Sequence, residues 1–403
     1  MLRYLRLFFI LICSILLACS PKVRKVATVP TKIPEEERSN IEKVEKKFTE
    51  AQIALLIPFK LNELNLKTAS KAQLDRANMA IDFYQGLTMG IDSAASLGLN
   101  FKINVYDTRD DDKQLANLIK QEAFKNSNLI IGPVFPEGLK YMAEYSQTKD
   151  VPIVSPLAAT RPSEFNNPKL ISMVNNIDQH AEKIAAYIGH KYPSSSSIVV
   201  LINANKKEDT EFASPLKAYL KENYPNLIVQ EFPSTNAFET RMVKGKRYAV
   251  VVCSSDVPFV ATSIDKLAKL TKLRTGGYDI NVFGHPNWAK QSYNIDNLQA
   301  LRTILSSSYF INYRSSAVVA FIKNYRNNFH FEPSEYSFKG FDIGFYFGKL
   351  MNKHGENYLD FLTKEKYKGL HHDFEFSYDP LYGYFNRTLM LLQYKDLALI
   401  RID

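Results

Sequence analysis

The hydrophobic positions of this chain alternate, from residue 51 onward, between short apolar runs and longer stretches that carry one apolar stripe. Each short run has the length and composition of a strand buried on both faces. These runs are residues 53–59, 101–107, 128–134 and 151–159. After the first run, Tyr84, Leu87 and Ile91 are spaced three or four residues apart, which predicts a helix. The repeated strand-helix order predicts a parallel sheet with right-handed crossovers.

The same alternation starts again near residue 169 and predicts a second parallel α/β unit. Its apolar runs are residues 169–175, 196–203, 226–232, 247–253 and 279–284. The helices expected between them are residues 178–192, 214–224 and 257–270. A strand at 303–312 and two helices at 315–329 and 338–355 follow. The tail has a hairpin-like pattern around Asp379–Gly383.

The N-terminus differs from this pattern and predicts an export signal over residues 1–18. Arg3 and Arg6 precede about 12 apolar residues, which is the length of a secretory signal and shorter than the roughly 20 residues of a membrane span. Residues 16–19, Leu-Leu-Ala-Cys, resemble the lipobox of bacterial lipoproteins. That resemblance implies cleavage before Cys19 and a diacylglycerol on its sulfur. A plain signal peptide with an incidental cysteine is the alternative.

Residues 19–50 predict a flexible tether between this anchor and the folded part. The segment is rich in Lys, Glu and Pro and buries too little apolar surface to fold alone. Ser20, and not aspartate, follows Cys19. By resemblance to sorted lipoproteins, this implies the outer membrane of a double-membrane cell, on its periplasmic face. A single-membrane host stays open as an alternative.

Composition and charge narrow the function further. With 45% hydrophobic and 12% aromatic residues among 403, the chain has material for two domain-sized cores. Once Cys13 and Cys19 are excluded, only Cys253 remains, in an apolar run that predicts a buried core thiol and no internal disulfide. The net charge is +9, but the basic residues are spread along the chain. This indicates a solvated surface, with attraction to anionic wall polymer or lipid as the alternative, and no nucleic-acid partner.

The chain carries no recognisable catalytic or cofactor motif. It has no G-x-S-x-G elbow, Walker A sequence, H-E-x-x-H or C-x-x-C. His371, His372 and Asp373 suggest a metal cluster, but neighbouring strand residues point to opposite faces, so at most one imidazole is expected to join Asp373, and a loop is favoured. Residues 107–112 lack EF-hand spacing and are expected to cap a helix. The sequence therefore predicts a non-enzyme without metal or cofactor.

Several stretches occur in an order that resembles the type I periplasmic binding proteins, the group that includes leucine/isoleucine/valine-binding proteins. The matching stretches are Pro58-Phe59, FYQGLTMGID, INVYDTRDD, LIIGPV, VPIVSPLAAT, SYFINY and FKGFDIG. The resemblance covers about 350 residues, from Ile53 to the C-terminus. It implies an α/β fold of two Rossmann-like lobes joined by three crossings. The expected lobes are 51–173 with 313–368, and 174–312 with 369–403.

The resemblance also implies a ligand cleft between the lobes, formed by loops beyond the carboxyl ends of strands. The residues expected to line it are Phe59, Phe135, Ser155, Ala158, Ala159, Ser254, Ser255 and His285. Two features depart from the family's amino-acid binders. The turn 132–136 lacks the serine that holds a ligand carboxylate, and 284–288 lacks the acid that pairs with a ligand ammonium. A degenerate cleft whose serines only end strands is the alternative.

Three functions remain open at this point. The first is a lipid-anchored binding protein that recognises a small polar or cell-wall-derived ligand. The second is an envelope scaffold, or a regulator of a cell-wall synthase or outer-membrane complex, with a vestigial cleft. The third is a substrate-binding protein of an amino-acid ABC transporter. An outer-membrane anchor and the two missing ligand contacts disfavour the third.

Overall fold

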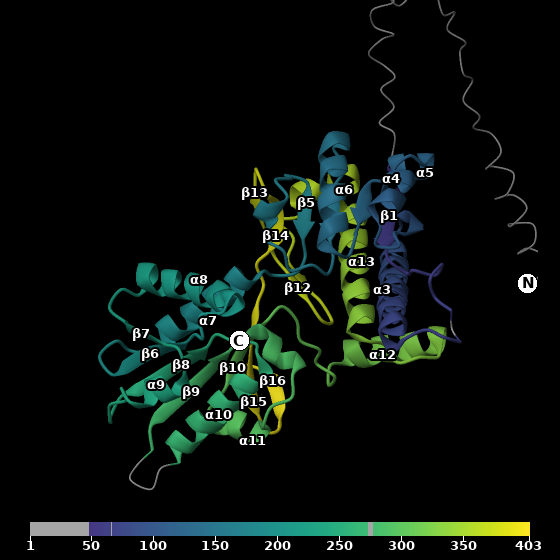
Figure 1. The fold of residues 1–403 in the computed structure, drawn as a ribbon. Coiled ribbons are helices and arrows are strands. Elements are labelled where there is room, and N and C mark those ends of the chain that lie inside the picture. The colour runs from purple at the N-terminus through teal and green to yellow at the C-terminus, as the bar shows by residue number, and fades with distance from the viewer. Residues whose placement is uncertain (1–47, 66, 273–276) are drawn as a thin grey trace, which may run out of the picture. The chain divides into compact units, whose positions relative to one another are not determined.

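The computed structural model describes residues 48–65, 67–272 and 277–403, which form two lobes built on two seven-stranded sheets (Figure 1). The expected signal at 1–18, Cys19 and the tether up to residue 47 lie outside the described residues. The first strand, β1 (Glu50–Ile57), begins where the tether was expected to end. In the described part of the chain, no helix has both the length and the apolarity needed to span a bilayer.

The sheet of the first lobe has the strand order β13-β14-β5-β4-β3-β1-β2. Its strands are β1, β2 (Asn100–Asp107), β3 (Leu129–Ile131), β4 (Ile153–Ser155), β5 (Leu170–Ser172), β13 (Phe376–Asp379) and β14 (Gly383–Asn386). All neighbours run parallel except β13, which is antiparallel to β14. Successive β1 residues enter two different cores: Ile53 and Leu55 pack on one face of the sheet, and Leu56 packs on the other. This is why the apolar run in β1 is continuous.

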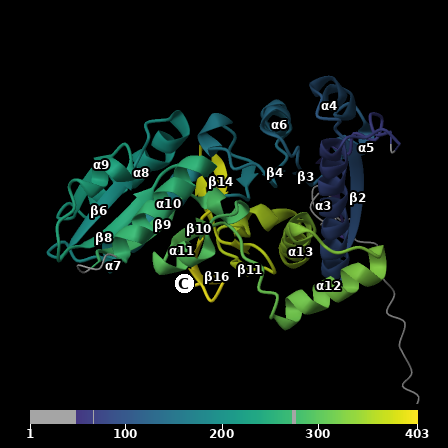
Figure 2. The same cartoon turned by 60° about the horizontal axis from the view of Figure 1, so that its bottom comes forward.

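Helices cover both faces of the first sheet (Figure 2). One face carries α3 (Lys71–Ala95) and α13 (Glu335–His354), and the other carries α4 (Asp112–Leu118) and α6 (Pro136–Lys149). The shorter elements are α5 (Glu122–Lys125), η1 (Pro162–Glu164), η3 (Gly355–Phe361), β11 (Tyr367–Lys368) and β12 (Asp373–Phe374). A further helix, α12 (Ser316–Phe329), crosses α3 and α13, and its Tyr325 hydroxyl donates to Gln85 at 2.6 Å.

The second lobe repeats the arrangement with the strand order β16-β15-β10-β9-β8-β6-β7. Its strands are β6 (Ser197–Ile202), β7 (Ile228–Phe232), β8 (Arg247–Val252), β9 (Asp279–Gly284), β10 (Ile304–Ser307), β15 (Met390–Lys395) and β16 (Ala398–Arg401). Its helices are α7 (Ile177–Lys191), α8 (Lys207–Asn223), α9 (Thr235–Glu239), α10 (Val257–Thr271), η2 (Pro286–Lys290) and α11 (Ile295–Ala300). Cys253 is fully buried at the end of β8, and burial raises its pKa, so it is a core thiol.

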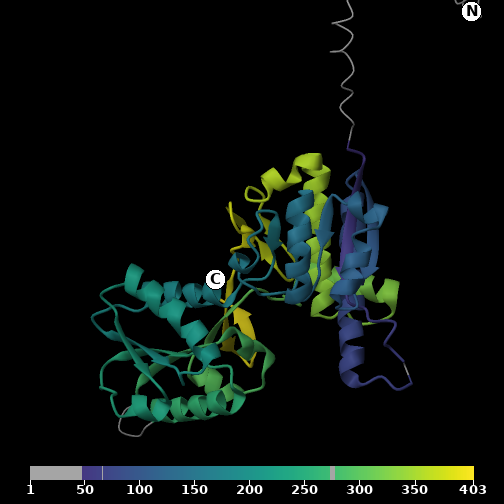
Figure 3. The same cartoon turned by 45° about the horizontal axis from the view of Figure 1, so that its top comes forward.

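The chain passes between the lobes three times in the described residues: after β5, after β10 and after β14 (Figures 1 and 3). The expected fold class, two Rossmann-like lobes with mostly parallel sheets, is therefore confirmed. One expected boundary needs correction, because the structure places residues 373–386 with the first lobe and not the second. The reason is that β14 pairs with the free edge of β5, through Tyr384 beside Ile171 and Phe385 beside Ser172. The third crossing therefore falls at residues 387–389.

The helices α3 and α13 touch backbone to backbone through glycines on both sides (Figure 2). A Cβ built on Gly344 would lie 2.5 Å from the carbonyl oxygen of Leu87, and one on Gly348 would lie 2.5 Å from the Cβ of Ala94. Gly86 and Gly90 of α3 meet the backbone of α13 at Ser337 and Phe341 in the same way. This contact joins a helix near the start of the chain to one that returns after the second lobe.

We expect Gly344→Ala to lower the free energy of unfolding by about 2 kcal/mol, because overpacking a tight contact costs about 1–3 kcal/mol and outweighs the helix propensity that alanine adds. Urea unfolding followed by circular dichroism measures the change. Lys349→Ala, on the exposed face of the same helix, is the matched control and should shift stability by less than about 0.5 kcal/mol. A Gly344→Ala protein as stable as wild type would show that the two helices can move apart without lowering the free energy of unfolding.

Candidate functional site

A polar cleft of about 400 Å³ lies beside the first and second crossings, and residues of both lobes line it. From the first lobe come Leu157, Ala159 and Lys339, and from the second come residues at the ends of β8, β9 and β10. Asn175 of the first crossing and the buried His372 line it as well. A volume of this size matches that of small-molecule sites in proteins.

His285 provides a hydrogen-bond donor of defined orientation on the second-lobe side of the cleft. It follows β9, and its Nδ1 accepts the backbone N–H of Asn287 at 3.2 Å. Burial lowers its pKa to about 4, so the ring is neutral at neutral pH. A neutral imidazole that accepts at Nδ1 carries its proton on Nε2. The Nε2–H group of His285 is therefore available to a ligand.

His180, on α7, is a second buried neutral imidazole in the cleft wall. Its Nδ1 lies 2.9 Å from Ser306 Oγ and its Nε2 lies 3.3 Å from Ser308 Oγ. Burial, with a smaller contribution from His285, lowers its pKa to about 3. A base this weak is poorly matched to proton abstraction near neutral pH, so the Ser308–His180 contact does not support nucleophilic catalysis. The ring holds the first residues of the second crossing against α7.

Two carboxylates that the sequence analysis missed, Glu208 and Glu211, also line the cleft. They belong to the first turns of α8, which begins at Lys207, whereas the sequence predicted a start at Ser214. Pro215 favours a helix start, and the structure instead carries the helix through it. The acidic run Glu208-Asp209-Thr210-Glu211 is typical of a first helical turn and could have located the true start.

Two lysines bring positive charge to the other side of the cleft, where they share one carboxylate. The ammonium of Lys339 lies 3.2 Å from Glu335 and 5.0 Å from the ring centre of Tyr309. Lys290 lies 4.0 Å from the same Glu335 carboxylate. Desolvation lowers the pKa of Lys339, and the Glu335 charge opposes this shift.

Next to the cleft, a hydrogen-bond network joins the first crossing to the end of β14. The carbonyl oxygen of Asn386 accepts from Asn175 Nδ2 at 2.9 Å and from Gln179 Nε2 at 2.8 Å. The Asn386 side chain donates in return to the carbonyl oxygen of Met173 at 3.3 Å. Because its amide nitrogen is used in this network, Asn175 leaves its Oδ1 buried and without a partner in the described residues.

His371 and His372 lie in a loop, as expected, and neither ring joins Asp373; the two rings instead come together beside Asp342. Their Nδ1 atoms are 2.7 Å apart, and the carboxylate near them is that of Asp342. Asp373 instead pairs with Arg401 at 3.0 Å. Alternating orientation applies within a strand, and β12 begins only at Asp373.

Asp342 serves as a backbone anchor and does not fit a metal ligand. Its oxygens accept N–H groups of Leu370, His371 and His372 at 2.8–2.9 Å and the hydroxyl of Tyr367 at 3.1 Å. These four donors occupy the lone-pair sites of the carboxylate. Burial raises its pKa to about 6, and the hydrogen bonds oppose that shift. The cluster ties the loop before β12 to α13.

The residues predicted to line the cleft separate into three groups. Ala159, Ser255 and His285 line it. Ser155, Ala158 and Ser254 are buried and are not among its lining residues; Ser254 instead accepts the indole N–H of Trp288 at its carbonyl oxygen, at 2.8 Å.

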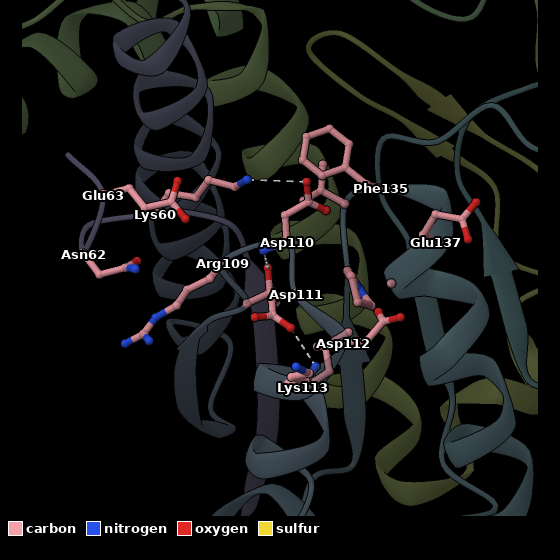
Figure 4. A pocket seen from close by; sticks show the side chains of 15 residues that line it. Lys60, Asn62, Glu63, Arg109, Asp110, Asp111, Asp112, Lys113, Phe135 and Glu137 are labelled. Atoms are coloured by element: carbon pink, nitrogen blue, oxygen red, sulfur yellow. Dashed lines mark hydrogen bonds and ion pairs between the residues drawn. The ribbon is translucent and has the colours of Figure 1, made fainter. Parts of the chain in front are cut away.

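Phe59 and Phe135 lie elsewhere, at the carboxyl ends of the first-lobe strands. Phe59 packs edge-on against Tyr84. Phe135 and Glu137 line a separate pocket of about 610 Å³, in which Lys60 lies 3.6 Å from Asp110 (Figure 4). Nearby, the Asp107 carboxylate accepts backbone N–H groups of Lys60 and Arg109, which explains the aspartate that ends β2. The pocket beside Phe135 is lined by both acidic and basic side chains, and we assign it no ligand.

Comparison with known proteins agrees with this architecture. No family model matches the chain, and no curated protein sequence matches it. A putative branched-chain amino acid ABC transporter protein from Rhodospirillum rubrum is 15% identical, with a TM-score of 0.62, over 88% of this chain and 100% of that one. A leucine complex of an ABC transporter substrate-binding protein from Desulfitobacterium hafniense is 12% identical, with a TM-score of 0.55, over 88% and 100% of the two chains.

The C-domain of LpoA from Haemophilus influenzae, described as a regulator of PBP1A, is similar to the same extent. It is 13% identical, with a TM-score of 0.56, over 88% of this chain and 100% of that domain. The chain therefore has the type I periplasmic binding protein fold. Identities this low establish the fold alone, so function has to be argued from the cleft.

We expect the protein to lose stability when the pH falls from about 6 to about 4. Burial lowers the pKa values of His180, His285 and His372 to about 3–4 and also lowers the pKa of His371, so the unfolded chain binds more protons in this range. Each of the four histidines contributes about 1.4 kcal/mol per pH unit. Asp342, whose pKa is raised, acts in the opposite direction, so the expected net slope is about 4 kcal/mol per pH unit.

Denaturant unfolding at several pH values measures this slope. His180→Gln should flatten it by about 1.4 kcal/mol per pH unit, whereas the exposed control His190→Gln should leave it unchanged. A slope near zero in the wild-type protein would contradict neutral buried histidines.

We expect Asp342→Asn to lower the free energy of unfolding by about 3 kcal/mol, because one amide oxygen cannot accept four donors and the amide NH₂ would face N–H groups. Glu356→Gln, exposed on η3, is the control. Addition of EDTA should leave the melting temperature of the wild-type protein unchanged. Stabilisation by Zn²⁺ that disappears in Asp342→Asn would instead reveal a metal site.

Proposed function

We propose that this protein is a non-enzymatic, lipid-anchored binding protein of the cell envelope that recognises a small polar or cell-wall-derived ligand in the cleft. The observation that carries the proposal is a cleft of about 400 Å³ lined by polar side chains of both lobes, among them Asn175, Ser255 and His285. Concave sites with a few converging polar groups are typical of small-ligand binding. The solved structures of similar fold include a leucine complex, so this fold supports small-ligand binding.

The anchor and its location rest on the N-terminal sequence. The lipobox-like residues 16–19 support a lipid on Cys19, and the polar segment that follows supports a tether to the periplasmic face of the outer membrane. A chain held there does not suit delivery to an inner-membrane importer. We therefore favour ligand sensing at the envelope over the function of a substrate-binding protein of an amino-acid transporter.

A second candidate, a scaffold or regulator of a cell-wall synthase or outer-membrane complex, is supported by the similarity to the LpoA C-domain. In that case the cleft would be vestigial, and partners would bind the outer surface of the lobes. The ion pair between Lys339 and Glu335 within α13 fits this candidate too, because it forms without a ligand.

Native mass spectrometry of the full chain, purified gently from its membrane, separates the two candidates. We expect a small retained ligand on the wild-type protein and none on Ala159→Trp, where the new side chain enters the cleft from an exposed position. Lys217→Ala, on the exposed face of α8, is the control that keeps the ligand. If no ligand is retained and crosslinking recovers the same envelope partners from both variants, the scaffold function is correct.

Cys19→Ser tests the anchor. Without the thiol, no thioether to diacylglycerol can form, so we expect the protein to move from the membrane fraction to the soluble envelope fraction. Cell fractionation with radiolabelled palmitate measures both location and acylation, and Cys253→Ser is the matched cysteine control. Retention of Cys19→Ser in the membrane with unchanged label would contradict the lipoprotein assignment.

A further inference from the structure

Two lysines from different lobes come together on one side of the cleft. Lys290 belongs to η2 of the second lobe, Lys339 belongs to α13 of the first lobe, and both line the cleft. The ring centre of Tyr309, which lines the cleft too, lies 5.9 Å from the Lys290 ammonium and 5.0 Å from the Lys339 ammonium. Two positive charges are therefore gathered beside a single aromatic ring.

These two lysines have only one carboxylate between them. The Lys290 ammonium lies 4.0 Å from Oε1 of Glu335, and the Lys339 ammonium lies 3.2 Å from Oε2. In the part of the chain that the structure describes, neither ammonium forms an ion pair with any other carboxylate. Asp342, on the same helix as Lys339, instead accepts backbone N–H groups of residues 370–372. Two positive charges and one negative charge leave this group of side chains with a net charge of +1.

The uncompensated positive charge is partly buried, which favours an anion beside it. Lys339 is 7% exposed, and its ammonium, which has three N–H donors, makes one hydrogen bond to Glu335. Desolvation and the charge of Lys290 lower the pKa of Lys339, and the Glu335 charge opposes this shift. Removing a charge from water is costly unless an opposite charge pairs with it. A ligand anion close to both lysines would supply the missing negative charge.

Two carboxylates on another side of the cleft limit how much negative charge a ligand can carry. Glu208 and Glu211 line the cleft from the first turns of α8. Among the described residues, neither forms an ion pair with the two lysines, so both carboxylates repel further negative charge on a ligand. A single carboxylate matches the net charge of +1, whereas a phosphate monoester carries about −1.5 to −2 near neutral pH.

We propose that Lys290 and Lys339 form a binding site for one carboxylate group, so that the ligand of the cleft is a monocarboxylate. Its carboxylate would accept N–H groups from one lysine of each lobe and would therefore link the lobes. The remainder of the ligand would occupy the cleft of about 400 Å³ among polar side chains such as Asn175, Ser255 and His285. This inference rests on the proposed binding function and narrows its ligand class.

Nuclear magnetic resonance of the full chain, labelled with carbon-13 at the lysine ε-carbons, tests the site with three probes at constant ionic strength. The probes are acetate, its uncharged isostere acetamide, and methyl phosphate. We expect acetate to shift the ε-carbon signals of Lys290 and Lys339 saturably, acetamide to leave them unchanged, and methyl phosphate to bind more weakly than acetate. The inference is wrong if acetate produces no saturable shift, if acetamide shifts the signals equally, or if methyl phosphate binds at least as tightly as acetate.

Two substitutions at the site should change the acetate affinity in opposite directions. Lys290→Gln removes one positive charge and should weaken acetate binding at least threefold. Glu335→Gln removes the carboxylate that competes with the ligand and should strengthen acetate binding at least threefold. Lys349→Gln, exposed on α13 and outside the cleft, is the matched control and should bind acetate as the wild type does. Any other pattern would contradict a site that works by charge.

The retained-ligand experiment separates this inference from the binding function. A retained ligand that lacks a carboxylate would overturn the inference while the binding function stands. A retained monocarboxylate that is lost in Lys290→Gln would support both. If acetate binds at the two lysines but the full chain retains no ligand, the carboxylate site stands and the proposed binding function loses its support.

Discussion

The structure depends on one contact, the approach of α13 to α3 along their glycines. Gly340 and Gly344 bring α13 against the backbone of α3, which leaves no room for a side chain between them. Because α13 follows the second lobe in sequence, the first lobe is completed only after the chain has crossed twice. The same helix carries Lys339 to the cleft and Asp342 to the loop before β12. Close helix packing therefore decides where the polar groups of the cleft stand.

Part of the cleft wall is built from neutral groups held by backbone and side-chain hydrogen bonds. His180 and His285 are kept uncharged by burial, and Asn386 fixes the orientation of Asn175. The ammonium groups of Lys290 and Lys339 share the single carboxylate of Glu335. These features suit recognition by hydrogen bonding, and none of them provides an activated nucleophile or a base suited to neutral pH.

Much of the fold followed from hydrophobic periodicity, because strands buried on both faces and amphipathic helices leave strong signals, as in β1 and α3. The hairpin β13–β14 was assigned to the wrong lobe, since sequence does not reveal which sheet edge a distant strand joins. In the cleft, Ala159, Ser255 and His285 were predicted from their position after strands. Glu208 and Glu211 were missed because the helix was predicted to begin only at Ser214, seven residues after its true start at Lys207. His372 was missed because ring convergence depends on the anchor at Asp342, 30 residues earlier.

Hydrogen–deuterium exchange resolved to individual peptides tests most directly whether the α3–α13 contact holds the first lobe together. The account predicts that amides of 335–354 exchange only through global unfolding, with the same protection free energy as the amides of β1 and β3. If α13 exchanges through a separate, lower-energy opening while β1 stays protected, the first lobe does not depend on the returning helix, and the account is contradicted.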